Sequence, residues 1–161
     1  MVPEAPLQET EAGLVPDGPG WFVLNVEETY FPQLGVNLIV LEPGEPIGMY
    51  HWEADQEDFL VLSGEALLLV EGEERPLRQW DFVHCPPETK HMLVGAGEGC
   101  TVLAVGAREH QAGGDWGGYT VDGVARRHGV GVDEETNDVA VAYARFAKSA
   151  QTRYRDGWLP W

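Results

Sequence analysis

Short apolar runs, interrupted by glycine and charged residues, occupy the middle of the chain. The runs lie within EDFLVLSG (57–64), EALLLVEGEE (65–74), RPLRQWDFVHCPP (75–87), KHMLVGAG (90–97) and CTVLAVGA (100–107). Two further β-rich segments, at 21–26 and 35–43, precede them. Breaks at intervals of roughly 8–12 residues are typical of a sandwich or barrel. We therefore predict an all-β fold, with tight turns at 63–65 and 71–74.

Several of these runs are apolar at consecutive positions, as in FLVL and ALLLV. A strand with one face in water should alternate, so these runs indicate cover on both faces. A second subunit could supply that cover, and so could the C-terminal third, where apolar residues follow helical spacing over 121–128 and 139–146. We expect a flexible arm over 1–20, a β-barrel over 21–107, and a C-terminal extension and apolar tail over 108–161, with short helices packed outside the barrel.

Composition narrows the possible partners. The net charge of −17 argues against nucleic acid, which needs a basic patch, and against an anionic membrane surface. No apolar stretch approaches the roughly 18 residues that a membrane span requires. Two cysteines imply no disulfide framework and fit a reducing compartment, and the N-terminus does not resemble a signal peptide. We therefore expect a cytoplasmic protein.

The candidate chemistry lies in MYHWEADQEDFLVLSG (49–64) and at His91. His51 and Glu53 are two apart, so on a strand they point to the same side, and a small turn would return Glu57 to that side. Buried carboxylates are costly unless a cation compensates them. Two imidazoles and one or two carboxylates in a closed pocket fit a divalent Fe, Mn, Ni, Zn or Co ion.

The spacing of these residues resembles the first motif of the cupin family, which is glycine, about five residues, His-x-His, three or four residues, Glu, six residues and glycine. Here Gly44 is followed after six residues by His51-Trp52-Glu53, and after three more by Glu57. Six residues then separate Glu57 from Gly64. Glu53 takes the place of the second histidine.

The second cupin motif is glycine, five residues, Pro-x-Gly, two residues and His. Pro86 and His91 match it, whereas Trp80 and Glu88 stand where the motif has glycine. A positive φ at Glu88 would cost about 1 kcal/mol. The resemblance covers roughly residues 21–107 and implies a double-stranded β-helix, the jelly-roll barrel of cupins.

The resemblance also implies a site and several possible functions. His51, Glu57 and His91 match the metal ligands of the family, and Glu53 is a fourth candidate ligand or, if it turns away from the metal, a catalytic base. By strand parity Phe59 and Val61 line the pocket, and Met49 lies near its mouth. The hypothesis is a metal-dependent oxygenase or isomerase with a small-molecule ligand.

Two alternatives lead to other functions. One is a non-catalytic cupin that binds or senses a metal or small molecule. The other is a metal-free epimerase of nucleotide-linked sugars, which we disfavour because only three basic residues lie in the barrel segment before Arg108. Small cupins commonly form homodimers, and the segment 21–26 is our candidate for strand exchange.

Overall fold

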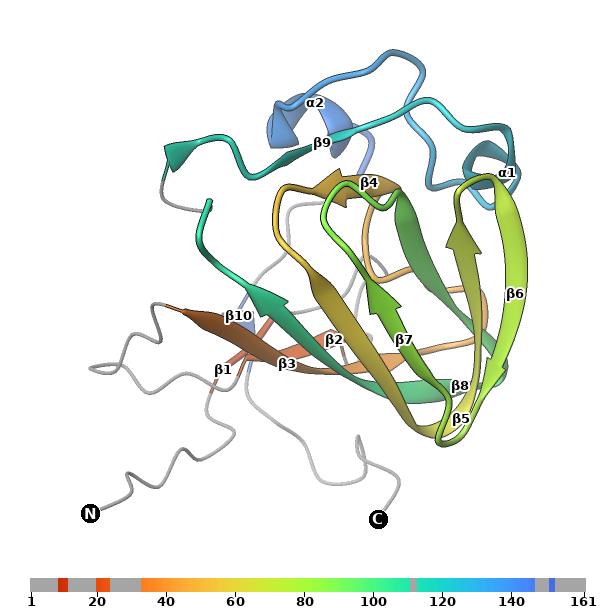
Figure 1. The fold of residues 1–161 in the computed structure, drawn as a ribbon. Helices are drawn as coiled ribbons and strands as arrows, with labels where there is room; N and C mark the ends of the chain where they lie inside the picture. The colour runs from red at the N-terminus through yellow and green to blue at the C-terminus, as the bar shows by residue number, and fades with distance from the viewer. Residues whose placement is uncertain (1–8, 12–19, 24–32, 111–112, 147–150, 153–161) are drawn as a thin grey trace, which may run out of the picture.

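The computed structural model of the protein describes residues 9–11, 20–23, 33–110, 113–146 and 151–152. In this part of the chain antiparallel strands form a barrel, and two short helices lie at one end of it (Figure 1). The strands are β1 (Glu9–Glu11), β2 (Gly20–Val23), β3 (Leu34–Leu41), β4 (His51–Glu53), β5 (Glu57–Val70), β6 (Glu73–Arg78), β7 (Phe82–Cys85), β8 (His91–Ala107), β9 (Gly117–Tyr119) and β10 (Gln151–Thr152). The helices are α1 (Gly123–Arg127) and α2 (Val139–Ala142). The predicted all-β fold with short C-terminal helices is confirmed.

Strand β8 pairs with three other strands, β3, β4 and β5. Its second half, from Cys100 to Ala107, pairs with β3, and most of its length pairs with β5. Its first residue, His91, pairs with His51 of β4. Strand β5 also pairs with β6 and β7, while β4 pairs with β9. The beginnings of β4, β5 and β8 therefore carry the histidines and Glu57 to one end of the barrel.

The predicted turn at 63–65 is wrong. Strand β5 runs through this segment without a break, and its pairing with β8 shifts register between Val61 and Ser63 and again between Gly64 and Glu65. The segments 90–97 and 100–107 likewise belong, apart from Lys90, to the single strand β8. A glycine with positive φ serves a bulge as well as a turn, which explains the error, since Gly64 has φ +74°.

Replacing Gly64 with alanine is expected to destabilise the barrel. A Cβ at this position would collide with the carbonyl oxygen of Gly99, and the left-handed backbone would be strained as well. We expect a loss of at least about 2 kcal/mol, which lowers Tm by roughly 5 °C or more. Thermal unfolding followed by circular dichroism measures this shift.

The matched control is Gly113→Ala, because a Cβ there meets nothing within 4 Å. An equal Tm for both variants would contradict the assignment of Gly64 to a tightly packed bulge.

The apolar run ALLLV is covered on both faces, as its lack of alternation predicts. Inside the barrel, Phe59, Val61 and Leu68 belong to one buried cluster. The neighbouring Leu69 points the other way, into a second cluster that includes Val124 of α1 and residues Tyr50, Met92, Val94, Ala125 and Val130. The C-terminal extension therefore supplies cover outside the sheet.

Capping residues mark where the two helices begin and where α1 ends. The side chain of Asp122 accepts a hydrogen bond from the backbone N–H of Ala125 at the start of α1, and the chain leaves this helix through Gly129, with φ +72°. Asp138 caps α2 in the same way. No helix in the described ranges is long and apolar enough to cross a membrane.

The terminal segments are described only in part. Strand β1, inside the expected flexible arm, pairs with β2 and with β10. Strand β2 pairs with β3 of the same chain. The rest of the arm and the apolar tail over 153–161 lie outside the described residues, and the homodimer stays a prediction.

Candidate metal centre

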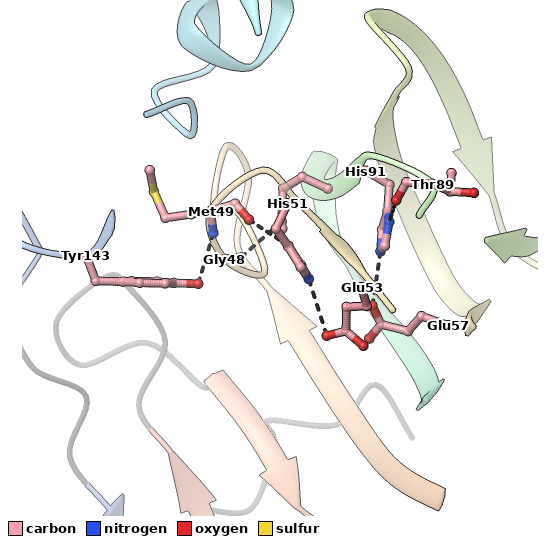
Figure 2. Close-up of polar contacts among 9 residues, drawn as sticks. Gly48, Met49, His51, Glu53, Glu57, Thr89, His91 and Tyr143 are labelled. Carbon is pink, nitrogen blue, oxygen red and sulfur yellow. Dashed lines mark hydrogen bonds and ion pairs between the residues drawn. The ribbon is translucent and has the colours of Figure 1, made fainter. Parts of the chain in front are cut away.

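Three side chains from three strands converge at the end of the barrel (Figure 2). His51 begins β4, Glu57 begins β5 and His91 begins β8. Each offers one ligand atom, and these atoms all lie within 4.8 Å of one another. The side chain of His91 is 2% exposed, and those of His51 and Glu57 are 14% and 18% exposed. His51, Glu57 and His91 therefore form a group that could hold a metal ion.

Backbone carbonyls fix the orientation of both imidazoles. The Nδ1 atom of His51 lies 2.8 Å from the carbonyl oxygen of Met49, and Nδ1 of His91 lies 2.9 Å from that of Thr89. A carbonyl oxygen only accepts hydrogen bonds, so each Nδ1 must carry the proton. In the neutral form of each ring, the lone pair is then on Nε2.

Both Nε2 atoms face a carboxylate. His91 Nε2 is 3.0 Å from Glu57 Oε2, and His51 Nε2 is 3.5 Å from Glu53 Oε1 (Figure 2). If the rings were neutral, the lone pair of each Nε2 would face a carboxylate oxygen, and two hydrogen-bond acceptors would then be in contact. Such a contact is unfavourable in a buried place. A positive charge, either a proton on the ring or a metal ion, is therefore needed between the groups. The donor set and the orientation of the rings fit a divalent ion.

In the metal-free protein this charge is a proton on His91. Burial disfavours the charged ring, but contacts with Cys85 and Glu57 outweigh it and raise the pKa of His91 to about 10. The protonated ring stabilises the metal-free fold fully below its ordinary pKa of 6.5, and this contribution is lost as the pH rises through about 10.

Metal affinity is consequently expected to rise with pH, because ligation must remove this proton. The apparent association constant should increase about tenfold for each pH unit between roughly pH 7 and 9, whereas an unperturbed histidine would already be neutral there. Titration of Mn²⁺ or Zn²⁺ against a competing chelator at three pH values measures the slope. An affinity independent of pH over this interval would contradict the protonated state of His91.

The other predicted site residues lie around this group. Glu53 is next to His51 but outside the group of three, so its role as ligand or base stays a prediction. The ring of Phe59 packs edge-on against His91 at 5.4 Å between centroids. Val61 is fully buried in the barrel core. Met49 acts through its carbonyl oxygen, and its side chain lines a different cavity of about 350 Å³ beside α2.

A cavity of about 180 Å³ opens beside the metal group. Glu53 and Glu57 line it from the side of the histidines, and Asp55, Arg108 and Trp116 line it elsewhere. The volume is below the range for drug-sized ligands, so the cavity fits a small molecule.

Three residues of the site were missed or underrated by the sequence analysis. Trp116 lies 6.0 Å from the ring of His51, between centroids, and Arg108 shares its cavity. Both residues follow the second cupin motif in the chain, so the residue spacing of the two motifs does not predict their position. Cys85, a buried residue of β7, contacts His91. Its position beside the site follows from its pairing with Glu57 across β5 and β7, which only the folded sheet shows.

Both non-glycine residues at glycine positions of the second motif keep a left-handed backbone. Trp80 has φ +74° and Glu88 has φ +68°. The positive φ considered for Glu88 is thus confirmed, and the turns that lead into β7 and β8 keep their shape despite the substitutions.

Comparisons with known proteins agree with the fold. Residues 37–106 match the family model of the cupin domain. A sugar phosphate isomerase from a cupin superfamily, from Silicibacter pomeroyi, is 27% identical, with a TM-score of 0.53 over 66% of this chain and 76% of that chain.

Two further structures are similar over a smaller part of the chain. A protein of Acidithiobacillus ferrooxidans, named as a proposed sugar phosphate isomerase, is 33% identical, with a TM-score of 0.46 over 47% of this chain. The match spans only about half of that protein, 51% of its chain. A cupin-like protein of Thermotoga maritima is 22% identical, with a TM-score of 0.49 over 56% of this chain and 68% of that chain. No curated protein is similar enough to count as a relative.

Proposed function

The chain belongs to the cupin superfamily, and we propose that it is a metal-dependent enzyme that isomerises a small hydroxycarbonyl compound. One observation carries the proposal. The two imidazoles are held by backbone carbonyls so that their Nε2 atoms face carboxylates, and a divalent ion would supply the positive charge that these contacts need.

His51, Glu57 and His91 would hold the metal, and Glu53 is a possible fourth ligand. A site with two carboxylates is harder than a three-histidine site and should favour Mn²⁺ or Fe²⁺ over Ni²⁺ or Zn²⁺. A bound divalent ion would supply Lewis-acid stabilisation of negative charge on substrate oxygens.

Residues of the chain would transfer the proton, limit access of water and restrict the size of the substrate. Glu53 lines the cavity and, when it is not a ligand, would take a proton from the hydroxyl-bearing carbon beside the carbonyl group and return it to the former carbonyl carbon. The hydroxyl proton of the substrate would pass to the former carbonyl oxygen in the same interconversion. Trp116 forms part of the wall that would limit access of water, and Phe59 fixes the ring of His91 from the core. The small cavity restricts the substrate to a few carbon atoms.

Isomerisation is favoured over oxygenation by one comparison. The Silicibacter pomeroyi protein, which is similar over two thirds of this chain, is named as a sugar phosphate isomerase. An isomerase needs a base beside the metal, and Glu53 supplies a candidate.

The test combines metal analysis with turnover. Protein purified without added metal should contain about one divalent ion per chain, and it should interconvert hydroxyaldehydes and hydroxyketones, with or without a phosphate group, without consuming O₂. Removal of the ion with a chelator should abolish turnover, and addition of Mn²⁺ or Fe²⁺ should restore it. Absence of metal from the protein would refute the proposal. Metal with ligand binding but no turnover would support the non-catalytic alternative.

A further inference from the structure

Arg108 is one of the residues that line the cavity beside the metal group. Arg108 follows directly after β8, and its backbone N–H donates to the carbonyl oxygen of Gln33 at 3.1 Å. Among the described residues that line this cavity, Arg108 is the one with a positive charge. Glu53 and Glu57, on the metal side, line the same space.

Gly35 makes room for this guanidinium group. A Cβ at Gly35 would lie 2.8 Å from both the Nε and an Nη atom of Arg108, too close for either to stay in place. Gly35 lies within β3 opposite Gly106 of β8, and its φ is not positive, so the backbone itself does not require glycine there. What position 35 requires is space, and the guanidinium of Arg108 occupies it.

The nearby Asp55 contacts His110 through both of its side-chain oxygens. Its Oδ1 lies 2.7 Å from Nδ1 of His110, and its Oδ2 accepts the backbone N–H of His110 at 2.9 Å. These contacts tie the segment that follows Arg108 to the segment between β4 and β5. They therefore help to fix the backbone that carries Arg108 at the edge of the cavity.

We propose that Arg108 binds the anionic group of the substrate, a carboxylate or a phosphate, while the oxygen atoms at the substrate's other end face the metal group. The inference rests on the proposed function and names its substrate class as small hydroxy acids or phosphate esters. A guanidinium group recognises both anions through paired hydrogen bonds, which a lysine cannot reproduce. In a chain with a net charge of −17, an anion would otherwise be repelled from this cavity.

The test measures binding of three small probes to the full chain by calorimetry, with and without Mn²⁺. Lactate carries a carboxylate, glycerol 3-phosphate carries a phosphate, and glycerol carries neither. The variants are Arg108→Gln, Arg108→Lys and Gly35→Ala. The matched control is Arg75→Gln, which removes a 62% exposed arginine paired with Glu73 on β6. Metal content and thermal unfolding are measured for every variant.

We expect the wild type and Arg75→Gln to bind at least one anion and to bind glycerol far more weakly. Arg108→Gln should weaken anion binding at least about tenfold, and Arg108→Lys should restore part of it. Gly35→Ala should weaken it as well, because it displaces the guanidinium. The preferred anion distinguishes a carboxylate substrate from a phosphate substrate.

Equal anion affinity in wild type and Arg108→Gln would overturn the inference, as would failure of the wild type to bind either anion. Metal content separates this result from the proposed function. Arg108 lies outside the metal group, so Arg108→Gln should keep its metal. A protein without metal whose anion binding still depends on Arg108 would refute the enzyme but support the anion site.

Discussion

Replacing His91 with alanine is expected to remove the metal almost completely, from about one ion per chain to near zero. His91 is one of three ligands in the group, and its ring is held by Thr89 and packed against Phe59. Loss of an outer partner of a metal ligand typically costs 10–100-fold in affinity, so we expect loss of the ligand itself to cost more than about 100-fold. Elemental analysis of protein purified without added metal measures the effect.

The control for this variant is His84→Ala. His84 lies on β7, is 49% exposed, and pairs with Asp58 at 2.6 Å, away from the group of three. It should keep its metal. Circular dichroism checks that His91→Ala still folds, and His51→Ala provides a second variant with the same expectation. Full metal content in both folded ligand variants would exclude the assigned site.

Replacing Glu53 with glutamine is expected to lower kcat at least about 100-fold while the metal content stays near one ion per chain. General acid–base catalysis contributes this much or more, and an amide of the same shape cannot take up the proton. KM should change little, because the side chain keeps its size. Steady-state kinetics on the best hydroxycarbonyl substrate, with metal analysis of the same preparation, measures both quantities.

This variant separates the two roles that remain open for Glu53. A drop in metal content would identify Glu53 as a fourth ligand. Unchanged metal and unchanged kcat would show that it is neither ligand nor base. The control is Glu73→Gln, since Glu73 is 67% exposed and paired with Arg75 on β6.

The metal group is recognisable from the spacing of its residues along the chain. His51, Glu57 and His91 each begin a strand, and a strand start is marked locally by the turn residues that precede it. The alternation of side chains along a strand also predicts that Phe59 and Val61 share a face of β5, and both belong to the buried cluster inside the barrel. Local rules of this kind need only a few neighbouring residues.

The same rules gave a wrong prediction at Gly64, because a glycine is typical of a turn and also of a β-bulge. Gly64 indicates a break in the apolar pattern, and only its pairing with β8 decides that the break is a bulge rather than a turn. The prediction for Met49 was based on its side chain, whereas the site uses its carbonyl oxygen and the side chain lines the cavity beside α2. The polarity of Gly64 and Met49 therefore predicts neither the bulge nor the use of the carbonyl oxygen.

Read along the chain, the apolar runs predict an all-β fold, and the resemblance to the two cupin motifs groups His51, Glu57 and His91, because both signals need only the order and spacing of residues. Which ring nitrogens face the acids, and the placement of Arg108 over Gly35 and of Trp116 beside His51, could be learned only from the folded chain. Those contacts join residues far apart in the chain, and they depend on the register between strands and on the space left where a side chain is missing.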